Sequence, residues 1–282
     1  MININYDTCI QCENCVKICP ASIFFTENGK IVLRNEDGCI VCGHCVGVCP
    51  TDSVVHSDFP KSKIHKINRA ELPSPDQLML LISSRRSNRA MGKKEVPEDK
   101  LQMILEAAHR APTAENKQLI NFTVIKGNEK VHAISQYTID TFSRIQKILS
   151  NPIVKPIIKP FMRDTFKMIP VFDHLKSEFA KGNDGIMRGA TTIIFITTKK
   201  SNRFGKEDAN LAYQNASLMA ESLGVAHFYM GFVLAAANID KGVKLGKILD
   251  IDERVCAAMA LGMPEVTFKN YIDRKDINIS TR

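Results

Sequence analysis

Eight of the nine cysteines lie in the first fifty residues, in two copies of one motif. Each copy reads Cys-x2-Cys-x2-Cys-x3-Cys-Pro, and the second follows the first after 30 residues. A spacing of two lets three thiolates of one tight loop reach three corners of a single iron–sulfur cubane, whereas the fourth cysteine lies too far along and ligates the other cubane. We therefore expect two [4Fe–4S] clusters. One would be held by Cys9, Cys12, Cys15 and Cys49, and the other by Cys39, Cys42, Cys45 and Cys19.

Structural zinc is the alternative for these cysteines. A zinc site usually takes two Cys-x2-Cys pairs that stand well apart in the sequence, and four crowded cysteines ending in Cys-Pro fit that pattern badly. Disulfides are disfavoured because the cytosol keeps thiols reduced. The ninth cysteine, Cys256, lies in the apolar run 255–261 and is expected to be a buried structural thiol. Electron transfer is thus the chemistry expected of the first fifty residues.

The net charge of +8 is unevenly distributed. Residues 1–60 carry a net charge of −4 and the remainder carries +12, and each oxidised cluster with its thiolates would add about −2 to the first part. An acidic module followed by a basic region is not the charge distribution expected of a nucleic-acid-binding protein. The basic region suits an anionic cofactor and acidic redox partners. The longest apolar stretch, 228–237, is too short for a bilayer, and residues 1–10 show no signal peptide. We expect no membrane span and a cytoplasmic location.

Three regions are predicted from the patterns along the chain. Residues 1–59 form the cysteine module, residues 60–74 form a linker rich in Lys, Pro and Ser, and residues 75–282 form a domain that alternates helical and strand patterns. Ser74-Pro75-Asp76-Gln77 supplies an N-cap, a proline at the first helical position and a capping-box glutamine. The further predicted elements are a helix from Pro97, a helix over 207–223, and strands over 121–126, 191–197, 225–233 and 255–261.

Residues 138–184 fit these patterns least well. They mix bulky apolar residues, lysines and four prolines. We expect a helical excursion that covers a pocket, because the prolines break any long amphipathic helix. A segment lying on a membrane surface is the alternative.

A basic element, Ser84-Arg85-Arg86-Ser87-Asn88-Arg89, ends the first helix of the second domain and suits a phosphate. Further motifs follow it in order: Val96-Pro97-Glu98, Ala111-Pro112-Thr113-Ala114-Glu115-Asn116, the strand 122–125, Asp184-x3-Arg188-Gly189, Met230-Gly231-Phe232, Ala260-Leu261-Gly262-Met263-Pro264 and Arg274-Lys275. In this order and spacing, they resemble the nitroreductase family of FMN enzymes over about residues 76–276. The cysteine module resembles bacterial two-cluster ferredoxins.

These resemblances imply the α+β fold class. A ferredoxin-type two-cluster module, built on a βαβ repeat, would precede a nitroreductase-like, FMN-dependent α+β sandwich domain. Members of that family form tight homodimers with two FMN molecules at the interface. The resemblance implies that Arg85, Ser87 and Arg89 hold the phosphate and ribityl chain, with Arg274 near the phosphate.

The resemblance also assigns residues to the flavin ring. Pro112, Thr113, Ala114 and Asn116 would line the ring from the partner subunit. The backbone amides of Met230 and Gly231 would point at its N5 and O4 edge. The chain departs from the family in two places. Thr113 stands where Ser is common, and Ile272 stands where one branch has a basic residue, so that one phosphate contact is either missing or supplied by Lys275.

The two modules together predict an iron–sulfur flavoprotein oxidoreductase. Electrons would pass from a one-electron donor such as a ferredoxin, through the clusters and FMN, to a nitroaromatic, quinone or enone. Two alternatives remain open: an enzyme that takes NAD(P)H directly at FMN with the clusters as an electron outlet, and a non-catalytic electron-transfer subunit. No catalytic acid–base residue is expected, and His227 is interpreted as a satisfied core histidine.

Overall fold

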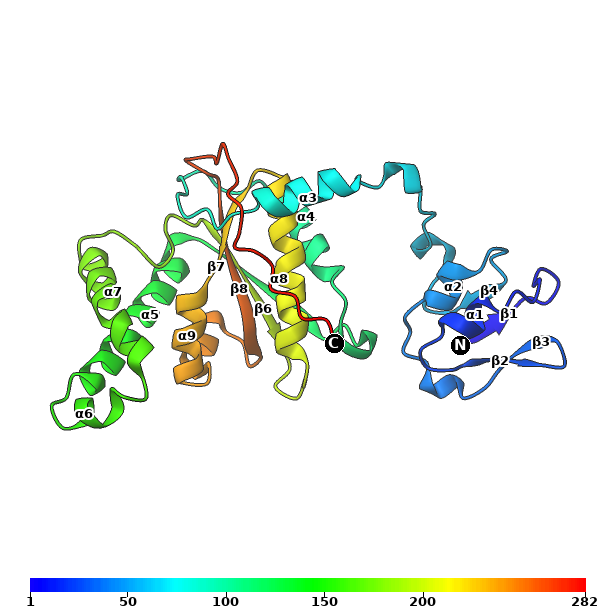
Figure 1. Ribbon diagram of the computed structural model, residues 1–282, viewed down its shortest axis with the longest axis horizontal. Coiled ribbons are helices and arrows are strands. Elements are labelled where there is room, and N and C mark those ends of the chain that lie inside the picture. The colour runs from blue at the N-terminus through cyan, green and yellow to red at the C-terminus, as the bar shows by residue number, and fades with distance from the viewer. The chain divides into compact units, whose positions relative to one another are not determined.

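The computed structural model describes the backbone of all 282 residues and every side chain except that of Val154. The chain divides into two compact units (Figure 1). The first comprises Met1–Pro73 together with Ala114–Gln118, and the second comprises Ser74–Thr113 together with Leu119–Arg282. The division after Pro73 lies at the end of the stretch predicted as a linker. Among the helices that the structure describes, none is long and apolar enough to cross a membrane.

The first unit is a small repeat of helix and hairpin elements. Strand β1 (Ile2–Ile4) pairs antiparallel with β4 (Val54–His56), and β2 (Phe24–Glu27) pairs antiparallel with β3 (Lys30–Leu33). Two five-residue helices, α1 (Asn14–Ile18) and α2 (His44–Val48), each carry the third cysteine of one motif. The alternation of the strands directs apolar side chains inward. The buried set is Ile2, Ile4, Cys15, Ile23, Phe24, Ile31, Cys45 and Val54.

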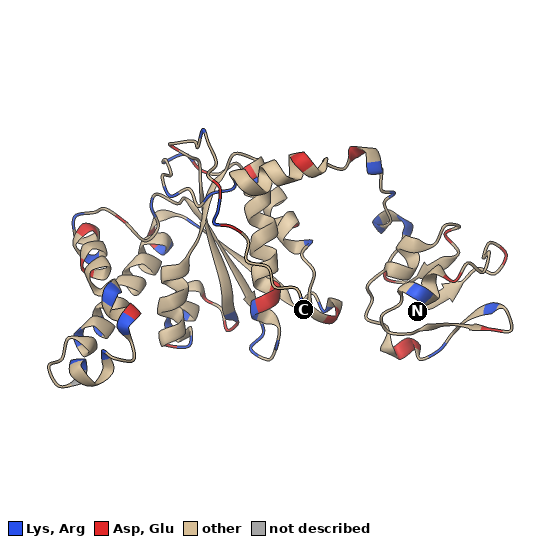
Figure 2. Cartoon of the chain, in the orientation of Figure 1, with Lys and Arg blue, Asp and Glu red and all other residues tan. Residues whose placement is uncertain are grey.

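Four short 3-10 helices complete the first unit: η1 (Glu36–Gly38), η2 (Lys61–Lys63), η3 (Arg69–Glu71) and η4 (Ala114–Asn116). The acidic module is followed at once by the basic residues Lys61, Lys63, Lys66 and Arg69, so that the charge changes sign along the unit (Figure 2).

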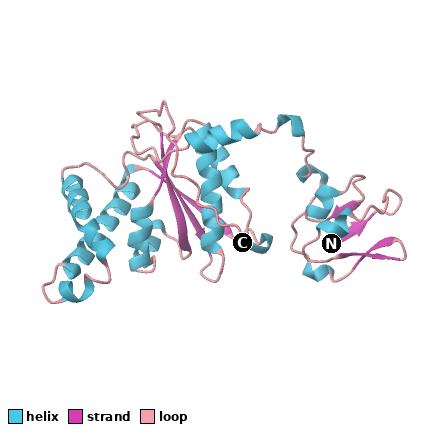
Figure 3. Ribbon diagram, in the orientation of Figure 1, coloured by secondary structure: helices cyan, strands magenta, loops and turns pink.

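A four-stranded antiparallel sheet forms the centre of the second unit (Figure 3). Its strands, in the order β5-β6-β8-β7, are β5 (Ile120–Lys126), β6 (Thr192–Thr198), β8 (Arg254–Gly262) and β7 (Ala226–Tyr229). Every residue of β6 is buried. Because successive side chains point to opposite faces, Ile193 and Phe195 enter one core while Ile194 and Ile196 enter the other.

Helices cover both faces of this sheet (Figure 1). One core lies under α5 (Asn128–Leu149), α7 (Arg163–Ala180), α9 (Gly231–Ile239) and α10 (Val243–Leu249), with α6 (Val154–Ile158) between α5 and α7 in the chain. The other core lies under α4 (Glu98–His109) and α8 (Gly205–Ser222). The buried alanines of α8 allow α4 to approach closely. They are Ala209, Ala212, Ala216 and Ala220. The predicted sandwich of helices and sheet is therefore confirmed.

The start of helix α3 (Pro75–Ser84) confirms the predicted capping box. The Ser74 side chain accepts from the Gln77 amide at 3.2 Å, and the Gln77 side chain accepts from the Ser74 amide at 2.9 Å. Two predictions were wrong. The strand expected over 225–233 ends at Tyr229 and gives way to α9, and α7 runs through Pro170 rather than breaking there. Tertiary packing against α5 outweighs the missing hydrogen bond at this proline.

Candidate cofactor sites

Two cavities in the first unit divide the eight motif cysteines between them. Cys9, Cys12, Cys15 and Cys49 line one, which we call the first cavity. Cys19, Cys39, Cys42 and Cys45 line the other, the second cavity. Each cavity is therefore lined by four motif thiols. The structure thus groups the cysteines crosswise, as the spacing predicts, while their role as ligands remains a prediction.

The local backbone conformation of each motif positions its sulfur atoms at the cavities. Helices α1 and α2 each follow a residue in the left-handed conformation, Glu13 at φ 62° and Gly43 at φ 71°. Each helix ends at the fourth cysteine of its motif, Cys19 or Cys49, whose backbone is extended. The chain therefore turns away from its own cavity and delivers that cysteine to the other one.

Backbone amides are directed at several of these sulfurs. Ile23 N–H lies 3.4 Å from Cys19 Sγ, Ser53 N–H lies 3.2 Å from Cys49 Sγ, and Val41 N–H lies 3.4 Å from Cys39 Sγ. Such donors stabilise a thiolate over a thiol, and they stabilise the charge of an iron–sulfur cluster. An apolar wall surrounds them, formed by Ile4, Ile31 and Val54 in the first cavity and by Ile2, Ile23 and Phe24 in the second. This combination fits a [4Fe–4S] cluster in each cavity.

The pKa values of the thiols point the same way. Burial raises the pKa of Cys45 to about 11 and also raises that of Cys15. Burial opposes ionisation of Cys49 as well, but the backbone amides of Thr51 and Val54, with others, outweigh it and lower the pKa of that thiol. The buried thiols of α1 and α2 therefore need a strongly bound cation to remain ionised.

A single metal ion fits these cavities less well. In the part of the chain that the structure describes, no group of three or more His, Cys, Asp or Glu side chains is placed to hold one ion. A structural zinc ion needs four ligands at about 2.0–2.3 Å from one point. Four thiols line each cavity, which matches the one thiolate that each of the four irons of a cubane takes.

A cavity in the second unit brings together three of the residues assigned to FMN. Arg89, Met230 and Gly231 line it, along with Arg188 and the aromatic residue Phe228. The guanidinium carbon of Arg89 lies 5.7 Å from the centre of the Phe228 ring, which orients the cation by cation–π attraction. Two guanidinium groups beside apolar and aromatic walls fit a group that carries both a phosphate and a flat ring.

Hydrogen bonds made by Arg86 and Asn88 hold the loop that carries Arg85, Ser87 and Arg89 in place. Asn88 is 8% exposed, and its side chain donates to Val266 O at 2.8 Å and accepts from Ala90 N at 3.1 Å. The side chain of Arg86 donates to Ile272 O at 3.1 Å. This contact holds the C-terminal segment beside the loop two residues before the exposed Arg274.

Arg85 lies at the end of α3, and its positive charge affects the pKa values of three ionisable groups. Burial raises the pKa of Tyr213 to about 12 and raises that of Glu221, and the Arg85 cation opposes both shifts. Burial lowers the pKa of His227 to about 4, the hydrogen bond to Val225 opposes this, and Arg85 adds to it.

The helix start at Gly231 corrects one expectation. Met230 was assigned a backbone amide that points at the flavin, but its N–H donates to Ala258 O at 3.1 Å and so belongs to the sheet. Gly231 is the first residue of α9, where backbone N–H groups have no partner within the helix. Of the two amides, that of Gly231 is the donor available to a ligand.

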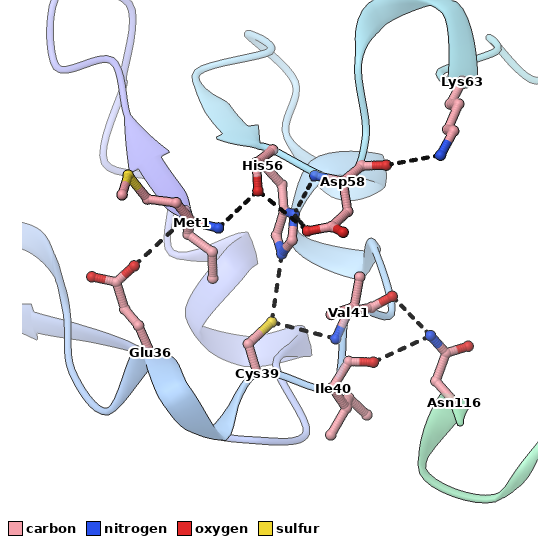
Figure 4. Close-up of polar contacts among 11 residues, drawn as sticks. Met1, Glu36, Cys39, Ile40, Val41, His56, Asp58, Lys63 and Asn116 are labelled. Atoms are coloured by element: carbon pink, nitrogen blue, oxygen red, sulfur yellow. Dashed lines mark hydrogen bonds and ion pairs between the residues drawn. The ribbon is translucent and has the colours of Figure 1, made fainter. Parts of the chain in front are cut away.

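Residues 112–116 are not among those that line this cavity. Asn116 belongs to the first unit, where its side-chain amide donates to Ile40 O at 3.2 Å and to Val41 O at 2.8 Å (Figure 4). In this chain the amide therefore supports the loop between Cys39 and Cys42. The roles of Pro112, Thr113, Ala114 and Asn116 toward a flavin of the partner subunit stay predictions.

Two features of the second unit were missed from the sequence. Arg188 lines the cavity but was given no role, although it belongs to the Asp184-x3-Arg188 motif. Asp184 organises that turn by accepting from the amides of Ile186 and Met187 at 2.8 and 2.9 Å. His227 is fully buried as expected, but only its Nδ1 has a partner, Val225 O at 3.2 Å. Its Nε2 has none among the described residues.

The comparisons with known proteins agree with this architecture. The nitroreductase family model matches residues 82–263, and the model of a 4Fe-4S dicluster domain matches residues 1–50. A nitroreductase with bound FMN from Bacteroides fragilis is 20% identical with a TM-score of 0.54, over 73% of this chain and 99% of that one. An FMN-bound nitroreductase from Desulfitobacterium hafniense is 19% identical with a TM-score of 0.54, over 72% of this chain and 97% of that one.

An FMN-dependent nitroreductase from Clostridium difficile is 20% identical with a TM-score of 0.51, over 74% of this chain and 100% of that one. No curated protein matches the sequence significantly. At these identities the solved structures show the fold, whereas the family model, which extends over more than half of the chain, shows the family. The chain therefore belongs to the nitroreductase family of FMN-dependent oxidoreductases and carries a 4Fe-4S ferredoxin-type domain over residues 1–50.

Proposed function

We propose that this chain carries electrons from a one-electron donor, by way of two [4Fe–4S] clusters, to FMN and on to a small organic acceptor. The observation that carries the proposal is the division of eight cysteines around two cavities in the same chain as an FMN reductase fold. Ferredoxin-type clusters have potentials near −400 mV, which is low enough to reduce a flavin. A ferredoxin is therefore the class of donor expected.

On the flavin side, FMN supplies the chemistry of collecting two electrons and passing them on as a pair. The chain's own residues bind and orient it. Arg85, Ser87, Arg89 and Arg188 would hold the phosphate and ribityl chain, with Arg274 nearby, and the Gly231 amide would donate to the ring. An uncharged donor there stabilises electron density on the ring without adding a fixed charge.

The acceptor is proposed to be a nitroaromatic, quinone or enone. These molecules accept two electrons at a flavin face without a protein nucleophile. We further propose a cytoplasmic homodimer, in which the partner subunit supplies the counterparts of Pro112, Thr113, Ala114 and Asn116 to the flavin.

The test uses protein purified without oxygen. About eight irons and one FMN per chain are expected if both cavities hold a cubane. Reduced ferredoxin should bleach the clusters and the flavin and should support turnover of a nitro compound.

A Cys15→Ser variant, with Cys256→Ser as its matched control, isolates the route. Cys15 lies in the first cavity and Cys256 in strand β8 of the second unit. The first variant should lose about half of the iron and most ferredoxin-driven turnover, while the control should keep both. Full ferredoxin-driven turnover in Cys15→Ser would refute the route, and equally fast flavin bleaching by NADH in both proteins would favour direct use of NAD(P)H.

A further inference from the structure

Two histidines, His44 and His56, line the second cavity, and His56 is the one with a ring nitrogen within hydrogen-bond range of a motif cysteine. His56 is the last residue of β4, its side chain is 3% exposed, and it lines the cavity beside Cys39. Its Nε2 atom lies 3.6 Å from Cys39 Sγ, within the range for hydrogen bonds to sulfur (Figure 4). The histidine therefore contacts a proposed cluster ligand directly.

The neighbours of His56 decide which ring nitrogen carries a proton toward Cys39. The backbone amide of Asp58 donates to His56 Nδ1 at 3.1 Å (Figure 4). A cysteine sulfur that ligates a cluster is a thiolate and has no proton to donate, so a hydrogen bond between Nε2 and Cys39 Sγ needs the N–H on Nε2. That N–H faces Cys39 Sγ and is the donor of the pair.

The ring is held in this orientation from several sides. Its centre lies 5.0 Å from that of Phe59 in a tilted arrangement. The Asp58 carboxylate lies 3.3 Å from Nδ1 and accepts from Ser57 Oγ at 3.2 Å. Pairing of His56 with Ile2 across the two strands fixes the backbone. A donor held this firmly loses little entropy when it bonds to the sulfur.

The first cavity has no imidazole among its lining residues; Ile4, Ile31 and Val54 line it instead. One period of 30 residues before His56 stands Thr26, whose hydroxyl donates to Glu13 Oε1 at 2.8 Å rather than to a cysteine. The nearest counterpart is Thr51, whose hydroxyl lies 3.8 Å from Cys49 Sγ and only 2.7 Å from Ser53 Oγ. The internal repeat is therefore broken at this position.

We infer that His56 donates an N–H···S hydrogen bond to Cys39 and makes the cluster of the second cavity the more easily reduced of the two. The inference rests on the proposed function, since it needs both clusters. One-electron reduction adds negative charge that spreads onto the cysteine sulfurs, and a donor stabilises the reduced form more than the oxidised one. One electron shared between the two clusters would thus reside mainly on the Cys39 side. His56 acts here as a positioning residue.

The test is a redox titration of this chain, purified without oxygen and monitored by electron paramagnetic resonance. His56→Phe keeps a ring against Phe59 but removes the donor, and His56→Gln keeps an N–H. We expect His56→Phe to make the higher-potential reduction step about tenfold less favourable, or about 59 mV lower for one electron. The other step should stay in place, and His56→Gln should restore part of the difference. Thr51→Val should leave the higher-potential step unchanged.

A spectroscopic readout independent of the potential uses protein labelled with ¹⁵N-histidine. The reduced wild type should show a ¹⁵N hyperfine coupling to a cluster, and His56→Phe should lose it. Two intact clusters with unchanged potentials in His56→Phe would overturn the inference alone, and so would a coupling that is unchanged in that variant but lost in His44→Phe, since His44 also lines the cavity. Protein that contains no iron would overturn both the inference and the proposed function.

Discussion

Acidification should destabilise the second unit through His227. This side chain is fully buried on β7, and burial lowers its pKa to about 4, against an ordinary value of 6.5. Between pH 4 and 6.5 the unfolded chain therefore binds a proton at this position that the folded chain does not. The free energy of unfolding rises with pH where the unfolded state binds more protons, so the stability present above pH 6.5 is lost as the pH falls toward 4.

The size of the effect follows from the two pKa values. At pH 7 the folded imidazole is unprotonated and about a quarter of the unfolded one is protonated, which costs only about 0.2 kcal/mol. At pH 5 the unfolded imidazole is almost fully protonated and the folded one hardly at all, which lowers the free energy of unfolding by about 2 kcal/mol relative to pH 7. The Nε2 atom has no partner among the described residues, so a proton there would gain no hydrogen bond from them in compensation.

The assay compares wild type with His227→Asn at pH 5, 6 and 7. The Asn amide can replace the Nδ1 donor to Val225 O, and any cavity it leaves costs the same at each pH. Urea unfolding can be followed by tyrosine fluorescence, since the chain has no tryptophan and Tyr6 is the only one of its five tyrosines outside the second unit. The wild type should lose about 2 kcal/mol more than the variant between pH 7 and 5. Parallel pH profiles would show that His227 is not held neutral by burial.

Three further outcomes are expected. Gly189→Ala should cost at least about 3 kcal/mol in urea unfolding, because a Cβ there would overlap a backbone oxygen at φ +80°; Gly182→Ala, at φ +88° with nothing within 4 Å, should cost only about 1 kcal/mol. Ile104→Ala, fully buried, should lower the free energy of unfolding by about 2–4 kcal/mol. Met103→Ala, at the exposed position next to Ile104, should change the free energy of unfolding by less than about 0.5 kcal/mol. Equal costs for the two variants would contradict the packing of α4. Arg188→Ala should weaken FMN binding about tenfold in a fluorescence titration, as expected on loss of one charge-assisted bond; unchanged affinity would remove Arg188 from the site.

Features that depend on neighbouring residues were predictable from the sequence. The capping box at Ser74 and the start of α3 need only residues within one helical turn, so local chemistry decides them. The buried strands β6 and β8 are continuous apolar runs, and a run of this kind is predicted as a strand whatever it packs against. The spacing of the two cysteine motifs likewise predicts iron–sulfur ligation by itself, because three cysteines this close in one loop seldom serve another purpose.

Features that depend on residues distant in sequence were decided only by the tertiary structure. Strand β7 ends at Tyr229 because the chain turns into α9 at Gly231, one residue after the Met230 amide makes its bond to Ala258 O, and the apolar run 225–233 carries no mark of that change. Pro170 stays within α7 because packing against α5 outweighs one missing hydrogen bond. His56 lies beside Cys39, 17 residues away, in a strand whose backbone is held by pairing with β1, where Ile2 lies opposite His56. Spacing along the chain determines which groups are chemically competent, whereas pairing and packing across it determine which of them meet.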